Sequence, residues 1–160
     1  MQIVHKIIHP VRNYFSGKMT LQKFLPGIAR FFMLLILLCI PGDDLPPAQD
    51  WFQYIFLDKW IHAGLFGLLA LLFMAPVLSG MAGKKKIPYA MVILLVVIIW
   101  GLITEFIQHY FISGRSFDIN DWLADSTGAI VAYFFSKHLF LMPPSEGFVS
   151  KDISADVPRQ

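Results

Sequence analysis

The sequence predicts an all-α integral membrane protein, a four-helix bundle with both termini on the cytoplasmic side. Its 160 residues are 56% hydrophobic and have a mean hydropathy of +0.61, more apolar than an ordinary soluble domain. The apolar residues gather in four runs, each close to the ~20 residues that a helix needs to cross a bilayer core. Basic residues concentrate in alternate loops between these runs. The length fits one compact bundle.

The chain divides into three parts. Residues 1–20 form a basic segment interrupted at Pro10, which is either an interfacial helix or a flexible tail. Residues 21–142 hold the four spans, and residues 143–160 form a polar tail expected to be flexible. Cys39 is the single cysteine, so no internal disulfide is possible.

Four helices are expected to cross the membrane. The first contains Arg30, which either snorkels to the headgroups or pairs with an acid on another helix. Residues 51–57 are aromatic but too short to span, so we expect them to lie at the membrane surface. The predicted spans are residues 21–40, 60–80, 87–110 and 121–142.

The distribution of charge predicts the orientation. The first, third and last non-spanning regions carry most of the basic residues: Lys6, Arg12, Lys18, Lys23, Lys84, Lys85, Lys86, Lys137, Lys151 and Arg159. The other two loops carry only Lys59 and Arg115. Since basic loops stay in the cytoplasm, we expect both termini there and most acids on the outer side.

Polar side chains then converge at the outer end of the bundle. Glu105 lies about five residues inside its helix end, or ~8 Å deep, so its carboxylate needs a proton, a cation or hydrogen bonds. Arg115 is the natural cation for it or for an aspartate. Spacings of three and four residues place several of these groups on shared helix faces. The candidate site residues are Asp58, Lys59, His62, Glu105, Gln108, Arg115, Asp118, Asp121 and Asp125.

Each of these residues also has a structural interpretation. Asp118 or Asp121 is placed to cap the fourth helix, and Asp58 the second. His62 is then a neutral core histidine bonded to a carboxylate, whereas Glu105 and Asp125 sit at no expected cap. The set is either a functional site or a packing network that fixes helix register. Small residues at Gly128 and Ala132 favour close helix contact.

The order of these motifs resembles the VanZ-like family. The pattern consists of DKxxH from Asp58 to His62, ExxQ from Glu105 to Gln108, then Arg115 and an aspartate-led helix start, and the resemblance covers about residues 30–140. Asp125 stands where asparagine is expected, and Ala132 where a second glycine is usual. The resemblance implies a small multi-pass protein of the bacterial cytoplasmic (inner) membrane. The founding member of the family is associated with low-level teicoplanin resistance.

The leading functional hypothesis is a role in the cell envelope or the glycopeptide (teicoplanin) response, through an anionic lipid or envelope precursor. Arg115 would anchor a phosphate beside Lys59, and Glu105 or His62 would act as acid/base if a reaction occurs. The sequence leaves open whether it is an enzyme. It identifies no cofactor, and it indicates the lipid bilayer as partner and no nucleic acid.

Three alternatives remain open. The carboxylates of Glu105, Asp118, Asp121 and Asp125 offer hard oxygen ligands for Mg²⁺ or Ca²⁺. The protein is otherwise a non-enzymatic partner of envelope proteins, with the polar cluster as a packing network. A proton-coupled transporter using Glu105 with Arg30 is the fourth hypothesis, although no repeat or broken helix supports it.

Overall fold

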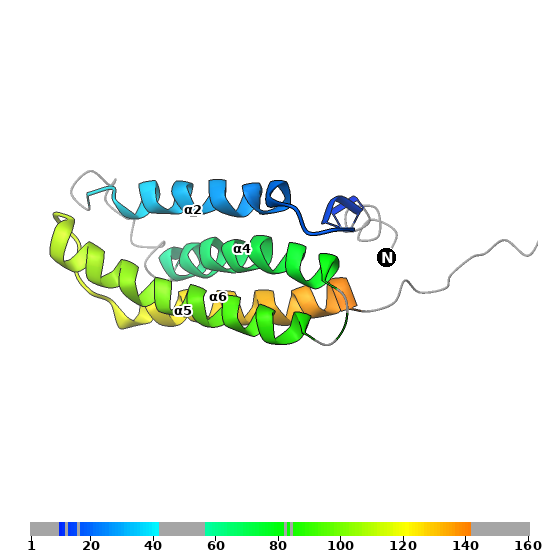
Figure 1. Ribbon diagram of the computed structural model, residues 1–160. Helices are drawn as coiled ribbons and strands as arrows, with labels where there is room; N and C mark the ends of the chain where they lie inside the picture. Colours follow the sequence, from blue (N-terminus) through cyan, green and yellow to red (C-terminus); the bar gives the residue numbers. More distant parts are fainter. Residues whose placement is uncertain are drawn as a thin grey trace, which may run out of the picture.

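The computed structural model describes residues 10, 11, 13–15, 17–41, 57–81, 83 and 85–141. This part of the chain is helical and contains no strand. Its elements run roughly along one axis (Figure 1): η1 (Leu21–Phe24), α2 (Leu25–Leu38), α4 (Leu57–Gly80), α5 (Lys86–Phe111) and α6 (Ile119–Leu141). The predicted surface segment, apart from its last residue, and the predicted C-terminal tail lie outside the described residues, and residues 1–20 are described only in part.

Three helical stretches are long and apolar enough to cross a membrane. They are Leu21–Leu38, formed by η1 and α2, then α4 and α5. The predicted all-α class is therefore confirmed, three helical stretches are candidate membrane spans, and their ends agree with the prediction to within a few residues. The fourth helix, α6, is not among the three; it has 23 residues but carries Asp121 and Asp125 in its first half.

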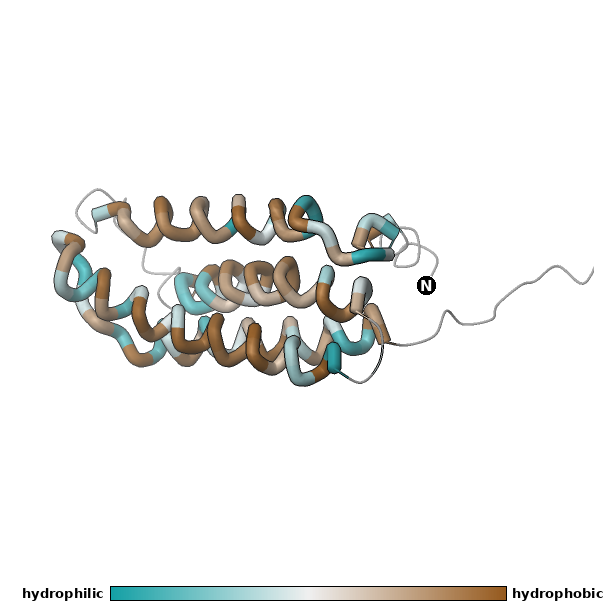
Figure 2. Tube along the Cα trace, in the orientation of Figure 1, coloured by the Kyte–Doolittle hydropathy of each residue, from teal (hydrophilic) through white to brown (hydrophobic). Residues whose placement is uncertain are grey.

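Hydrophobic residues predominate along the middle of the helices (Figure 2), and many of the large ones are exposed on the outside of the bundle. Val96 on α5 is 58% exposed and Phe134 on α6 is 62% exposed. A soluble protein of this size would not present so many large apolar groups to water. Lipid tails are the solvent that suits this surface.

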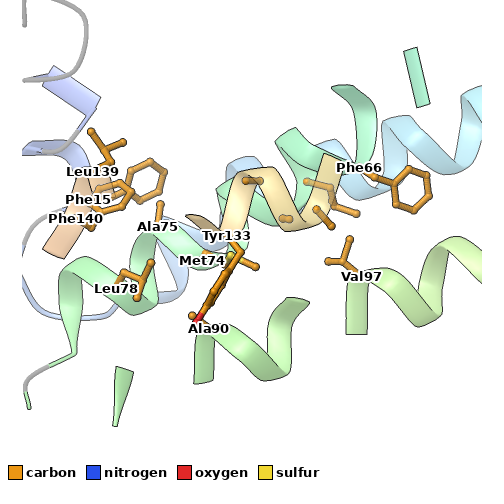
Figure 3. Close-up of a cluster of buried hydrophobic side chains, with 14 of the residues drawn as sticks. Phe15, Phe66, Met74, Ala75, Leu78, Ala90, Val97, Tyr133, Leu139 and Phe140 are labelled. Atoms are coloured by element: carbon orange, nitrogen blue, oxygen red, sulfur yellow. The ribbon is translucent and has the colours of Figure 1, made fainter. Parts of the chain in front are cut away.

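The core lies mainly where α4 meets α6 and α5 (Figure 3). Phe66 and Met74 of α4 are fully buried, and α4 packs more extensively on α6 than on any other element. Near the far end of α6, the rings of Phe15 and Phe140 meet edge to face at 6.3 Å between centroids. By contrast, α2 makes its helix–helix contacts chiefly with α4 and leaves much of its surface uncovered.

Gly128 allows α6 to approach α4 very closely. A Cβ placed at Gly128 would lie 2.0 Å from the carbonyl oxygen of Ala63. Only glycine leaves room for this contact, as the small residues of the sequence predicted. The contact sits one residue beyond His62 on α4 and three beyond Asp125 on α6, so it sets how near these two side chains come.

The charges separate to opposite ends of the bundle. Ser79 near the end of α4 donates a hydrogen bond to the carbonyl of Phe15 at 2.6 Å, and Lys23 donates to the same carbonyl at 3.0 Å. These bonds bring the N-terminal segment to the turn between α4 and α5. The end of the bundle at this turn holds Lys18, Lys23, Lys85, Lys86 and Lys137, and we name it the basic end. The acidic end, where α4 and α6 begin, holds Asp58, Lys59, Asp118 and Asp121.

Candidate functional site

Lys59 is the centre of an ion-pair network at the acidic end. Its Nζ lies 3.1 Å from Asp58 Oδ2 and 2.6 Å from Asp118 Oδ2, and it also pairs with Asp121. Lys59 is in the first turn of α4, and both Asp118 and Asp121 are at the start of α6. The network therefore joins the beginnings of the two most closely packed helices.

Asp118 also caps α6. Its Oδ1 accepts hydrogen bonds from the backbone N–H of Asn120 at 2.8 Å and from the Asn120 side-chain amide at 3.0 Å. This is the structural role that the sequence offered for Asp118. The hydrogen bond from Lys59, followed by that from the Asn120 backbone, lowers the pKa of Asp118 below its ordinary value. Asp118 is thus held as a carboxylate.

Deeper in the bundle, three titratable side chains meet from three helices. His62 of α4, Glu105 of α5 and Asp125 of α6 are all buried, and their nearest donor atoms lie within 4.8 Å of one another. Nδ1 of His62 lies 3.0 Å from Oδ1 of Asp125. We name these three residues the buried triad.

Glu105 connects the buried triad to the loop before α6. Its side chain is in the last third of α5 and 1% of the residue is exposed. Oε2 accepts a hydrogen bond from the backbone N–H of Asp118 at 3.0 Å, whereas Oε1 is buried without a partner among the described residues. Glu105 is therefore only partly satisfied by the protein.

Gly101 makes room for Asp125. A Cβ at Gly101 would lie 3.2 Å from both Cβ and Oδ2 of Asp125 and 3.5 Å from the ring of Phe66. Asp125 Oδ2 is itself buried without a hydrogen-bond partner within the described part of the chain. The sequence did not single out Gly101 or Phe66. A signal was present, because Gly101 lies one helical turn before Glu105 on the same face of α5.

Arg115 does not make the ion pair that the sequence suggested. Lys59 occupies that place, since the first turn of α4 faces the start of α6 directly. Arg115 follows the end of α5 in a turn whose backbone N–H bonds to the carbonyl of Ile112 at 3.3 Å. Its Nε is buried without a partner in the described structure, and no ion pair forms to Arg115 within those ranges.

Gln108 has a different role from Glu105, one turn away. Its Nε2 donates to the carbonyl of Leu38 at 3.4 Å. This carbonyl is one of those left free at the end of α2. Gln108 therefore fastens the end of α2 to α5 at the acidic end. Arg30 of α2 forms no ion pair with a described acid, and its guanidinium contacts the sulfur of Met33 at 3.8 Å.

Below that link, an apolar groove of about 360 Å³ lies at mid-height of the bundle. Its walls come from α2, α4 and α5, and the rings of Phe31 and Trp100 meet across it at 5.0 Å between centroids. Val92, Val96, Ile99 and Ile103 of α5 line it and are exposed to the bilayer side. The groove ends at Ile103, two residues before Glu105. The sequence did not predict it, because a groove between helices depends on their relative positions.

A protein-family model spans the helices that form this arrangement. The VanZ/LLP1 family model matches residues 24–141, which is well over half of the chain and includes every described residue of the acidic end. The chain belongs to the VanZ/LLP1 family. No curated protein and no solved structure shows a significant match to it. In this VanZ-like chain the candidate site has three parts: the Lys59 network, the buried triad and the apolar groove.

Proposed function

We propose that this VanZ-like protein crosses the bacterial cytoplasmic membrane four times, with both termini in the cytoplasm. The separation of charge supports this orientation, because basic ends of membrane helices stay in the cytoplasm. α6 is the fourth span: its 23 residues reach about 35 Å at 1.5 Å per residue, enough for a bilayer core. The acidic end then faces outward. Reporter fusions at Gly83 and Gly114 test this, and a reporter at Gly83 that is active outside the cell would refute it.

We propose further that the protein acts in the cell envelope by binding an anionic lipid or a lipid-linked envelope precursor. The apolar groove is the observation that carries the proposal. A volume of about 360 Å³ is within the range of ligand sites. The groove opens to the bilayer and ends near the acidic end, so a lipid tail can enter it sideways while the headgroup stays at the membrane surface.

Arg115 is the group best suited to hold the headgroup. Lys59 already has three carboxylates around it, whereas Arg115 forms no ion pair within the described residues. A guanidinium binds phosphate in a bidentate geometry. Glu105 and His62 are the candidates for proton transfer if the bound lipid reacts, because both are buried in the adjoining triad.

Native mass spectrometry tests lipid binding. The purified full chain is incubated with a polyisoprenyl phosphate or with phosphatidylglycerol, and Arg115→Gln and Val96→Trp are compared with the wild type. We expect retention of the anionic lipid in the wild type and its loss in both variants. Lys85→Gln, at the basic end, is the matched control. Equal retention by all four proteins would refute the proposal.

The glycopeptide response has a separate test. Expression of the chain in a teicoplanin-susceptible bacterium is expected to raise the concentration of teicoplanin that stops growth, and Arg115→Gln is expected to remove the effect. An unchanged concentration for the wild type would remove this part of the proposal.

A second candidate function is modulation of an envelope protein, with the polar cluster as a structural network. The Lys59 network favours it, because its charged groups already pair with one another, join α4 to α6 and cap α6. Asp121→Asn distinguishes the two. A packing role requires that stability and activity fall together, whereas loss of activity in a fully stable variant would contradict it.

A further inference from the structure

The buried triad contains two carboxylate oxygens that the protein leaves without a partner. Glu105 Oε1 and Asp125 Oδ2 are both buried and accept no hydrogen bond from the described residues. The residues themselves are 1% and 0% exposed. Buried carboxylate oxygens are costly unless a donor or a cation satisfies them. The other oxygen of each carboxylate is already bonded, to the Asp118 amide and to His62.

Among the described residues, no lysine or arginine forms an ion pair with Glu105 or Asp125. Lys59 Nζ pairs with Asp58, Asp118 and Asp121, and with neither Glu105 nor Asp125. Arg115 forms no ion pair within the same ranges. Two carboxylates therefore face one imidazole in a site largely shielded from water.

We propose that His62, Glu105 and Asp125 form a binding site for a divalent transition-metal ion of the Zn²⁺ type. One imidazole nitrogen with two carboxylate oxygens is a mixed donor set, which suits Zn²⁺, Mn²⁺ or Fe²⁺. Mg²⁺ and Ca²⁺ prefer oxygen ligands alone. The carboxylates in this interpretation are the two that the protein leaves unsatisfied, not the aspartates that pair with Lys59.

The distances between the donor atoms of the three side chains allow them to coordinate one ion after a small movement. Zn²⁺ binds nitrogen and oxygen at about 2.0–2.2 Å, so neighbouring ligands on one ion are roughly 3–3.5 Å apart. The 3.0 Å between His62 Nδ1 and Asp125 Oδ1 is within this range, so an ion that replaces the hydrogen bond between them can bind both side chains, with Asp125 Oδ2 as the second oxygen of the carboxylate. The remaining separations, up to 4.8 Å, require side-chain movement of about 1 Å. Gly101 favours this movement, since a Cβ there would lie only 3.2 Å from Asp125 Oδ2.

Three protein ligands leave a fourth position for water or another ligand, as in catalytic zinc sites. The inference stands apart from lipid binding, because none of the three ligands lines the apolar groove. A shared proton is the competing explanation for the two unpartnered oxygens, and the experiment separates them.

The full chain is purified with a tag that contains no histidine, stripped with EDTA and titrated with Zn²⁺. Zinc content is measured by inductively coupled plasma mass spectrometry, and affinity by calorimetry. We expect one Zn²⁺ per chain in the wild type. In Glu105→Gln and Asp125→Asn we expect the affinity for Zn²⁺ to fall at least roughly tenfold. His109→Gln removes an exposed imidazole of α5 from the same end of the bundle and is expected to bind as the wild type does.

Absence of stoichiometric Zn²⁺ in the wild type would overturn the proposal, as would equal weakening by His109→Gln. If the triad variants fail to fold, the wild type loaded with Co²⁺ decides. Ligand-field absorption bands of a protein-bound, low-coordinate Co²⁺ support the site, and the spectrum of aqueous Co²⁺ overturns it. Lipid retention by the EDTA-treated protein is measured in the same preparations, so failure of the metal site and failure of lipid binding give different results.

Discussion

Gly128→Ala is the perturbation that most directly tests the packing that forms the site. The added Cβ would lie 2.0 Å from the carbonyl oxygen of Ala63, where real contacts are at least about 3.0 Å. The obstacle is backbone, so it cannot rotate away as a side chain does. α4 and α6 must therefore separate by about 1 Å at this point.

The expected cost follows from two effects. Forcing a methyl group into a closely packed interface costs about 1–3 kcal/mol. A separation of about 1 Å also stretches the 3.0 Å contact between His62 and Asp125 beyond hydrogen-bonding distance. The loss of that contact leaves buried polar groups unsatisfied, for a further ~1–3 kcal/mol. We expect Gly128→Ala to lower the free energy of unfolding by about 2–6 kcal/mol in total.

The assay is unfolding by sodium dodecyl sulfate in mixed micelles, followed by circular dichroism. Gly64→Ala is the matched control, because a Cβ at Gly64 meets nothing within 4 Å. Replacing an exposed helical glycine by alanine stabilises a helix by up to about 1 kcal/mol. If Gly128→Ala unfolds at the same point as the wild type or as Gly64→Ala, the close contact between α4 and α6 does not exist as described.

Three further predictions concern the acidic end. Lys59→Met is expected to lower the free energy of unfolding by about 1–3 kcal/mol, because three carboxylates lose their shared cation, whereas the exposed Lys85→Met is expected to change it little. The pKa of Asp118 is lowered in the folded state, so its contribution to stability is complete above the ordinary aspartate pKa of about 4 and is lost as pH falls through the lowered value. Below about pH 4, the free energy of unfolding should therefore change less with pH in Asp118→Asn than in the wild type, and an unchanged pH profile would exclude this role. Gln108→Leu is expected to cost about 1 kcal/mol and to speed proteolysis near the end of α2, since the carbonyl of Leu38 loses its donor; equal cleavage rates would contradict this.

Much of the fold could be predicted from the sequence, because membrane helices are recognised from the length and hydropathy of apolar segments. The ends of α4 and α5 lie close to the predicted limits of the second and third spans. The contact at Gly128 was also predictable, since few residues other than glycine and alanine allow helices to approach so closely. α6 was predicted as a span from its length and its apolar second half. Its first half is rich in aspartate, so its composition is mixed.

The candidate site was predicted less completely. The alternating direction of the spans was enough to place Asp58, His62, Glu105 and Asp125 at one end of the bundle. Which cation meets which acid depends on how α4 and α6 rotate about their axes, and a single sequence does not determine this rotation. For that reason Arg115 was expected in the place that Lys59 occupies. The apolar groove escaped prediction for the same reason.

The modest hydropathy of α6 has a consequence for how the protein is made. A segment with Asp121 and Asp125 in its first half partitions poorly into lipid when it leaves the ribosome alone. α4 is synthesised earlier and carries Lys59 and His62, the partners of those two aspartates. In the proposed four-span arrangement, pairing of Asp121 with Lys59 and of Asp125 with His62 would offset the cost of inserting α6, because α4 enters the membrane first.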